Sequence, residues 1–281
     1  VKDIKIHRQH YRERLLKLAV DLKDADSDSR AKASGLSADI TSYFLPYQGG
    51  QDDKELQCLY GEMVAGLWQA SNSKASLASG EISDTRIHVM FLSEFVWRHT
   101  NWRMKRGWVK FLDRDRFRVS CLHLGSRTDE MTWEIKEYAD AFYHIPNNLN
   151  NARELIREAK PDVIFYPEVG MSGIVQCLAS QRLAPVQCCG IGHPVTTGLP
   201  TMDYFVSGDL IEPECAEEHY NEKLIKLPGI SFPYIPAPLP ALDLKRSFFG
   251  LKEKEIVYLC LQSPQKYLPG DDHMYAEIAA R

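Results

Sequence analysis

A short stretch in the second half of the chain carries residues suited to bind a sugar. Residues 190–197 read Gly-Ile-Gly-His-Pro-Val-Thr-Thr and lie between two apolar runs. Gly192 allows the backbone to come close to a ligand, and His193 can donate or accept a hydrogen bond. The hydroxyl groups of Thr196 and Thr197 can do both. A tight crossover loop without a ligand would use the same glycines, so this motif alone leaves both interpretations open.

A histidine in an earlier loop could move a proton. His99 follows Arg98 directly before a predicted helix. Its neutral imidazole, with an ordinary pKa of about 6.5, can accept a proton at physiological pH, and a helix N-terminus lowers that pKa further. The alternative is a surface histidine that caps or solvates a turn. His99 is therefore a candidate catalytic base, with capping as the open alternative.

A third polar loop, at residues 167–173, reads Pro-Glu-Val-Gly-Met-Ser-Gly and precedes another predicted helix. The backbone N–H groups at such a helix start can hold an anion or a sugar hydroxyl, although the carboxyl group of Glu168 disfavours an anion. The alternative is an ordinary strand-to-helix turn. In that case Gly170 supplies a positive φ and Ser172 caps the helix.

The spacing of apolar residues predicts the elements that must position these loops. Apolar residues recur at helical intervals between Tyr11 and Leu22 and between Leu56 and Leu67, which predicts two N-terminal helices. From Arg86 onward, short β-rich runs alternate with helical stretches; the β-rich runs are residues 86–92, 117–124, 141–145, 162–167, 185–191 and 203–208. This alternation predicts an α/β fold with a parallel sheet covered by helices on both faces. Ligands of such sheets bind at the carboxyl ends of the strands, where all three polar loops are predicted to lie.

The length and composition fit a globular protein of roughly two domains. The chain has 281 residues, of which 44% are hydrophobic, and a domain averages about 150 residues. The polar stretch at residues 24–35 predicts a loop between the N-terminal helices. Residues 71–84, rich in serine, predict a linker to the next domain.

The charge pattern argues against nucleic acid as a partner. The formal net charge is −4, which provides no overall basic field. A basic stretch does span residues 98–116, within a predicted helix whose buried stripe is Met104, Trp108 and Leu112. We expect its cations on the opposite, solvated face, so the stretch does not predict a surface for phosphates.

The cysteines and the hydropathy pattern predict a soluble, cytoplasmic protein. The seven cysteines are odd in number and form no Cys-x-x-Cys pair, as expected for reduced thiols. No run approaches the ~20 apolar residues of a membrane span, and the first residues lack the apolar centre of a signal peptide.

One long block resembles a known enzyme family. Residues 184–229 resemble, in order and spacing, a segment of the O-GlcNAc transferase family, the tetratricopeptide-linked glycosyltransferases and their bacterial relatives. Residues 89–102 are similar to the family's first strand with its histidine loop, and residues 113–125 to its second strand. Residues 43–63 resemble the helical part before the catalytic domain, so the resemblance runs from about Ser42 to the C-terminus.

The resemblance implies a GT-B enzyme, in which two Rossmann-like domains face each other across a cleft. The implied organisation is a helical region at 1–84, an acceptor-side Rossmann-like domain at 85–240 and the truncated start of a UDP-sugar-binding domain at 241–281. Such enzymes transfer a sugar from a UDP-sugar to a side chain of an acceptor polypeptide, here expected without a metal ion. The chain would then be an incomplete catalytic region.

The resemblance also implies roles for particular residues. The run at 255–266 resembles the family's strand and lysine that open the second domain, which makes Lys266 the residue that grips the UDP diphosphate. The backbone at Ile191 and Gly192 would hold the sugar, and His99 would orient or deprotonate the acceptor.

The sequence departs from the family pattern at several positions. Thr100 replaces a proline, Glu168-Val169-Gly170 replaces an Asn-Gly pair, and Ser263 replaces a glutamine. These departures leave two alternatives open. One is a non-catalytic protein-interaction module with a decayed sugar site, and the other is a different GT-B enzyme acting on UDP-sugars, such as an epimerase.

Overall fold

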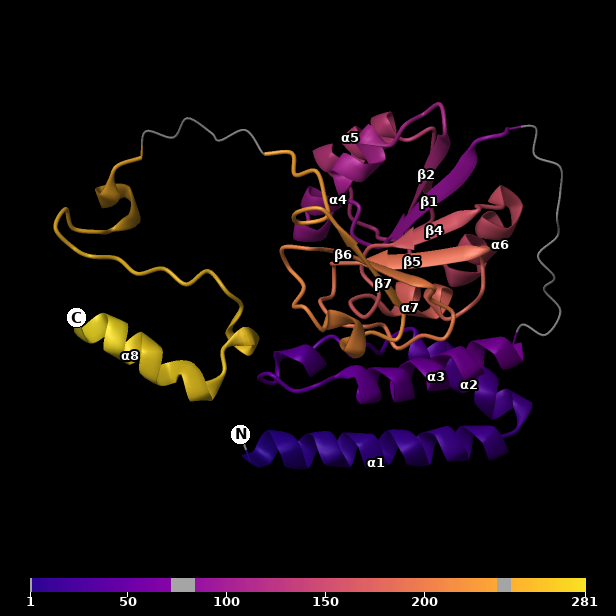
Figure 1. Cartoon of the computed structure of the whole chain (residues 1–281), viewed down its shortest axis with the longest axis horizontal. Helices are drawn as coiled ribbons and strands as arrows, with labels where there is room; N and C mark the ends of the chain where they lie inside the picture. The colour runs from indigo at the N-terminus through magenta and orange to yellow at the C-terminus, as the bar shows by residue number, and fades with distance from the viewer. Residues whose placement is uncertain (1, 72–83, 237–243) are drawn as a thin grey trace.

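The computed structural model describes residues 2–71, 84–236 and 244–281, and its centre is a parallel sheet with helices on both faces (Figure 1). The sheet has seven strands in the order β3-β2-β1-β4-β5-β6-β7. The strands are β1 Ile87–Ser93, β2 Phe117–His123, β3 Ala141–His144, β4 Val163–Tyr166, β5 Val186–Gly190, β6 Tyr204–Gly208 and β7 Lys223–Leu227. Every pairing is parallel, which confirms the expected α/β, Rossmann-like doubly wound sheet.

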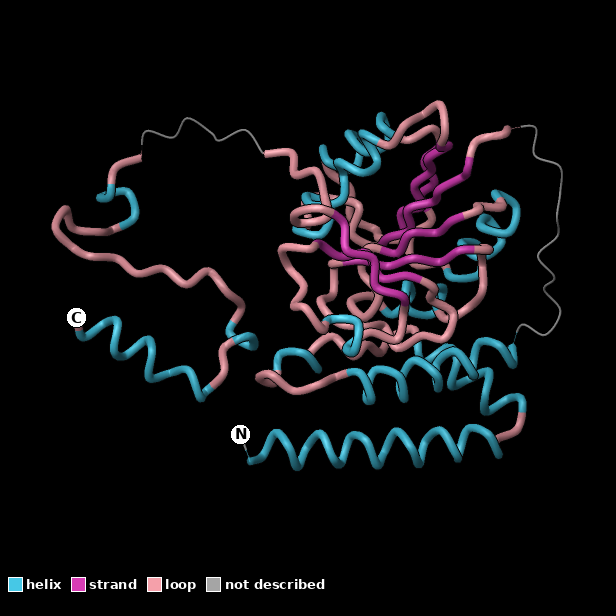
Figure 2. The backbone as a smooth tube through the Cα atoms, viewed as in Figure 1, coloured by secondary structure: helices cyan, strands magenta, loops and turns pink. Residues whose placement is uncertain are grey.

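Two apolar cores lie on the two faces of the sheet. On one face, α4 (Thr100–Phe111) and α5 (Glu130–Tyr138) cover side chains such as Phe91 and Val119. On the other face, α6 (Leu149–Ala159) and α7 (Gly173–Ala179) cover the alternate side chains of the same strands. Figure 2 shows the strands between these helices. Both faces are buried at the centre of the sheet, which explains why the central strand β4, Val-Ile-Phe-Tyr, is apolar throughout.

The N-terminal helices form a further layer beside the sheet domain (Figure 1). The two predicted helices are confirmed as α1 (Lys2–Asp24) and α3 (Lys54–Ser71), and they pack against Cys177 of α7. The prediction of a loop at residues 24–35 was wrong, because α2 (Ser27–Ser37) occupies most of it. The Asp26 side chain caps this helix by accepting from the Ser29 amide.

The buried face of α4 differs from the predicted stripe. Trp102, Lys105 and Val109 are fully buried, whereas Met104 and Trp108 are only partly buried. Arg106 is buried as well. The expectation that all cations of this helix face solvent was therefore wrong.

A segment distant in sequence explains this burial. Residues 231–235, which follow β7, lie across α4, where a Cβ on Gly107 would stand 2.2 Å from the Pro233 carbonyl oxygen. Lys105 Nζ is 5.0 Å from the centroid of the Trp108 ring and 5.2 Å from that of Phe232. The aromatic rings cover the long lysine side chain, and no local spacing in the sequence reveals that cover.

The C-terminal segment lacks the strand that the resemblance implies. Residues 256–261 form no strand, and Ile256 and Leu261 are 80% and 91% exposed. A strand needs a neighbour for its backbone groups, and this segment pairs with none within the described residues. The helix expected next is present as α8 (Asp272–Ala280).

The predicted domain division falls on parts of the chain outside the description. Most of the linker at 71–84 coincides with residues 72–83, and the boundary near residue 240 lies within 237–243. The division therefore stays a prediction. Across the described parts of the chain, no helix is both long and apolar enough to cross a membrane.

Candidate functional site

The three polar loops follow β1, β4 and β5, which are adjacent in the sheet. All strands are parallel, so these loops meet at the carboxyl edge. The chain order reverses between β1 and β4, because β2 and β3 lie on one side and β5 to β7 on the other. In open α/β sheets, ligands bind at such a switch point. The topology therefore confirms that the three loops share the carboxyl edge, and the site at this edge stays a prediction.

Glu168 ties these loops together at the switch point. Its side chain is fully buried; Oε1 accepts a hydrogen bond from the Glu94 amide at 2.7 Å and Oε2 accepts one from Asn101 Nδ2 at 3.0 Å. Burial raises the pKa of Glu168 to about 8, and the hydrogen bonds to its oxygens only partly oppose this shift. The residue thus fixes the loop after β1 and the first turn of α4 against the loop after β4.

We predict that the two polar contacts of Glu168 matter more for stability than its charge. Glu168→Ala would leave the buried Asn101 amide nitrogen and the Glu94 amide without acceptors, at about 1–3 kcal/mol for each unsatisfied group. Glu168→Gln keeps the shape. Asn101 Oδ1 has no partner among the described residues, so a flipped Asn101 amide could accept from the new glutamine. In urea unfolding at neutral pH, we expect the wild type and Glu168→Gln to have a clearly larger free energy of unfolding than Glu168→Ala.

The raised pKa of Glu168 also makes the stability of the fold depend on pH. A carboxyl group whose pKa rises on folding stabilises the fold fully below its ordinary pKa of 4.5 and loses that contribution as pH rises toward about 8. The free energy of unfolding of the wild type should therefore fall across this window relative to Glu168→Gln. If the free energies of unfolding of the two proteins changed with pH in parallel, the raised pKa of Glu168 would be contradicted.

The loop after β5 packs directly on the loop after β4. Gly192 faces Pro167, and a Cβ built on it would lie 1.8 Å from the Pro167 carbonyl oxygen and 3.0 Å from Asn101 Nδ2. Ile191 forms an isolated parallel bridge with His193. The close approach that Gly192 permits is therefore to the protein's own backbone, and it brings this loop next to the start of α4.

His193 links the same loop to the N-terminal region. Its side chain is buried, and Nε2 donates to the Tyr43 carbonyl oxygen at 3.1 Å. Burial lowers the pKa of His193, which keeps the ring neutral. On its other side lies Gly170, where a Cβ would come within 2.8 Å of Nδ1. Gly170 has the predicted positive φ, 92°, and Ser172 caps α7 as the turn interpretation expected.

The two threonines have an internal role. Thr196 Oγ1 donates to Glu222 Oε2 at 2.6 Å, and the hydroxyl of Thr197 donates to Glu222 Oε1. The amide of Thr197 donates to the same oxygen at 2.8 Å. Both hydroxyl protons are engaged and both side chains are buried, so these residues stabilise the loop, and their part in sugar binding stays a prediction. Glu222 lies 25 positions after Thr197, within the block of family resemblance, but it was not predicted as a site residue.

His99 caps α4 through Nδ1, and its Nε2 has no hydrogen-bond partner among the residues that the structure describes. Its Nδ1 accepts a hydrogen bond from the backbone N–H of Asn101 at 3.3 Å, which confirms the capping interpretation. The ring stacks on Phe95, with centroids 4.7 Å apart, and meets Trp97 edge-on at 5.1 Å. Burial lowers the pKa of His99. Because Nδ1 accepts the cap hydrogen bond, the neutral ring carries its proton on Nε2, which can donate to a ligand. Accepting a proton at Nε2 requires the other tautomer, in which Nδ1 carries the proton and the cap is released.

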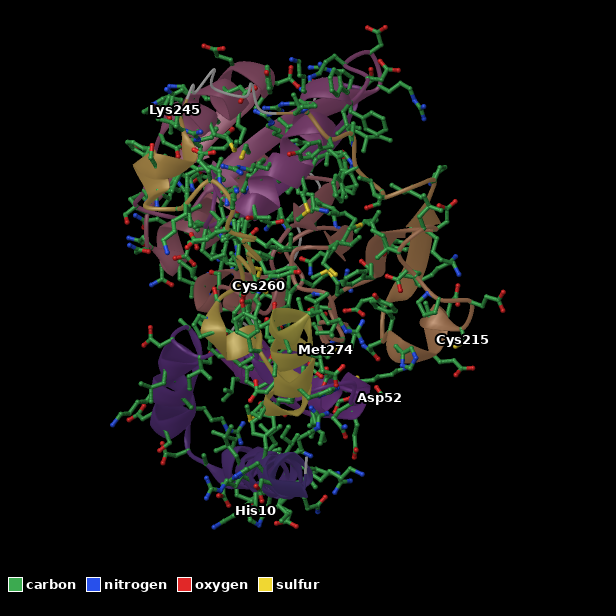
Figure 3. The ribbon with its side chains drawn as sticks, turned by 90° about the vertical axis from the view of Figure 1, so that its left-hand side faces the viewer. His10, Asp52, Cys215, Lys245, Cys260 and Met274 are labelled. Carbon is green, nitrogen blue, oxygen red and sulfur yellow. The ribbon has the colours of Figure 1, made fainter. Side chains whose placement is uncertain are left out.

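Lys266 reaches the N-terminal region close to His193. It lies at the end of η4 (Pro264–Lys266), and its Nζ is 4.9 Å from the centroid of the Tyr47 ring. Tyr47 packs against Tyr43 at 5.5 Å, and Tyr43 contacts the His193 ring at 5.6 Å. Figure 3 views the molecule from the side of this C-terminal segment, with Met274 of α8 labelled. The structure thus brings the loop after β5 and Lys266 to the same two tyrosines.

The structure brings the sequence-predicted residues together in two separate sets of contacts. Gly192 and the helix capped by His99 meet through Asn101, and His193 and Lys266 meet through the tyrosines. Glu168 and Asn101, which stand at the centre of these contacts, were not predicted as site residues. From the sequence, Glu168 was considered only as a carboxyl group that disfavours an anion and as a departure from a family pattern, although its position almost directly after a buried strand was the available signal.

Comparison with known proteins gives partial matches. No protein-family model matches this chain. A UDP-glucose:protein N-beta-glucosyltransferase of Actinobacillus pleuropneumoniae serotype 5b is 33% identical over 109 residues, which are 37% of this chain and 17% of that protein. The probable UDP-N-acetylglucosamine–peptide N-acetylglucosaminyltransferase SPINDLY of Petunia hybrida is 35% identical over 88 residues, 30% of this chain and 9% of that protein. The corresponding SEC protein of Arabidopsis thaliana is 26% identical over 178 residues, 60% of this chain and 18% of that protein.

A solved structure agrees with the fold. A mutant O-GlcNAc transferase of Thermobaculum terrenum superposes with a TM-score of 0.58 at 21% identity, covering 80% of this chain and 43% of that one. At this level of sequence identity, the similarity shows a shared fold and nothing further. The chain spans less than a fifth of the length of each curated relative named above.

Proposed function

Because sequence and fold relate this chain to the O-GlcNAc transferase family, we propose that it is part of an enzyme that transfers a sugar from a UDP-sugar to a polypeptide side chain. The relatives matched in sequence are protein glycosyltransferases by name. The observation that carries the proposal is the placement of Lys266 against Tyr47, which packs on Tyr43. Tyr43 in turn contacts His193, in the loop of highest family resemblance.

In this proposal the described sheet is the acceptor-side domain of a GT-B enzyme, and residues 244–281 begin the donor-side domain. His99 orients the acceptor nucleophile through Nε2–H, or deprotonates it in the tautomer that carries the ring proton on Nδ1 and has released the cap. The nucleophile attacks the anomeric carbon while UDP leaves. Lys266, in place of a metal ion, neutralises the charge that develops on the diphosphate. The backbone at Ile191 and Gly192 faces the sugar.

We propose a cytoplasmic location for this enzyme. The support is that the cysteines, among them the exposed Cys215 labelled in Figure 3, are free thiols. Proteins of oxidising compartments tend to pair such residues.

Titration of the full-length protein with UDP in a calorimeter tests the proposal. We expect a heat of binding, and Lys266→Ala should weaken the affinity by about tenfold or more because it removes a charge-assisted contact to a diphosphate. The matched control is Lys254→Ala, an exposed lysine of the same segment. An absence of heat with the wild type would favour the non-catalytic interaction module instead.

A further inference from the structure

A cavity opens between the first turns of α4 and α5, beside the proposed catalytic residue. Its volume is about 200 Å³, and residues of the segment after β7 form its third wall. Three of its lining residues are arginines: Arg98, Arg103 and Arg106. Arg98 immediately precedes His99.

Arg106 forms the deep part of this cavity, which we call the arginine pocket. Its side chain is 8% exposed; one guanidinium nitrogen lies 2.8 Å from a Glu134 carboxylate oxygen, and another donates to the Ile235 carbonyl oxygen at 2.7 Å. The remaining nitrogen, Nε, is buried and has no partner among the described residues. A buried donor of this kind is costly to leave unsatisfied, so it marks the place of a missing acceptor.

The other two arginines of the pocket, Arg98 and Arg103, add positive charge. Among the residues that the structure describes, neither Arg98 nor Arg103 forms a side-chain ion pair, and both are exposed. Among the lining residues, Glu134 is already paired with Arg106, and Glu130 is the one further acid against the two other guanidinium groups. The nearby Asp129 carboxylate lies outside the lining and accepts from the Arg98 backbone N–H and from the first turn of α5. The pocket therefore carries a net positive charge and suits an anion.

The other lining residues favour an organic anion over inorganic phosphate. Met131 is almost fully buried, and Ile235 and Tyr234 stand opposite it. An aspartate or glutamate side chain presents an apolar stem to these residues and a planar carboxylate that arginine can bind through two parallel hydrogen bonds.

We propose that the arginine pocket binds an acidic side chain of the acceptor polypeptide and so selects acceptors with Asp or Glu near the modified residue. This inference rests on the proposed function, because it assigns the occupant by the adjacency of Arg98 to His99. The carboxylate lies between Arg98 and Arg103, with Arg106 Nε–H donating to it from below.

Paired peptides test this proposal. Fluorescence anisotropy compares labelled acceptor-type peptides that carry glutamate near the central Asn, Ser or Thr with peptides that carry glutamine at the same positions. We expect the best glutamate peptide to bind the full-length protein about tenfold more tightly than its glutamine partner. Arg103→Gln should remove this preference. Arg103 is exposed, so the variant keeps the fold.

The matched control is Arg116→Gln, which removes the same charge from an exposed arginine just before β2, at the amino edge of the sheet. It should retain the preference. Equal affinities for glutamate and glutamine peptides, or a preference that survives in Arg103→Gln, would overturn the proposal. Displacement of the peptide by inorganic phosphate but not by succinate would also overturn it, because the pocket would then be a phosphate site.

Sugar transfer to the same peptides separates this proposal from the proposed function. Transfer without a glutamate preference in binding would refute the arginine pocket and leave the glycosyltransferase standing. A glutamate preference lost in Arg103→Gln, without any UDP binding or transfer, would refute the enzyme and with it the role of the pocket in acceptor choice.

Discussion

Replacing Gly192 by alanine should destabilise the chain by more than about 3 kcal/mol, the upper range for overpacking in a core. The reason is the Pro167 carbonyl oxygen, 1.8 Å from the position of the new Cβ. A side chain could rotate away from such a contact, but a backbone carbonyl at the end of β4 can move only if the loop moves. Urea unfolding followed by circular dichroism measures the loss.

The matched control is Gly66→Ala on α3. No heavy atom lies within 4 Å of its Cβ position, and alanine favours a helix by up to about 1 kcal/mol over glycine. This control should therefore be as stable as the wild type or more stable. A Gly192→Ala protein of wild-type stability would mean that the loop after β5 packs less tightly on Pro167 than described.

Replacing His99 by alanine should lower kcat of the complete enzyme by about 100-fold, the lower range for a positioned acid or base. Because His99 also caps α4, part of any loss could come from a frayed helix. His99→Asn separates the two effects, since asparagine caps well but cannot exchange a proton in this range. We expect Asn to restore stability without restoring kcat, with UDP affinity unchanged in both variants.

The pH profile gives a second measure of His99. A general base acts in its neutral form, and burial holds the pKa of His99 below its ordinary value of 6.5. The acid limb of kcat/KM should therefore lie below pH 6.5 and disappear in His99→Asn. Full activity of either variant would limit His99 to capping.

Local patterns were sufficient to predict much of the fold. The apolar runs predicted β1 to β6, and helical spacing predicted α1 and α3. The edge strand β7 was missed because its sequence, Lys-Leu-Ile-Lys-Leu, is short and only partly buried. At residues 24–35, serine and aspartate suggested a loop, although Asp26 in fact starts a helix that packs on α3.

The sequence by itself determined which loops share the carboxyl edge, because alternating strands and helices leave few topologies for a parallel sheet. It also determined the turn at Gly170 and Ser172, where backbone conformation depends on the residues themselves. These features rest on interactions between neighbours in the chain.

Only the tertiary structure decided how the polar groups at that edge are used. The hydroxyls of Thr196 and Thr197 meet Glu222, and Arg106 is buried beneath a segment more than a hundred residues away, with its contact to Ile235 spanning 129 positions. Such partners are chosen by long-range packing. A hydrogen-bonding group in a sequence can serve a ligand or the protein itself, and only the folded chain fixes which atom stands within its reach.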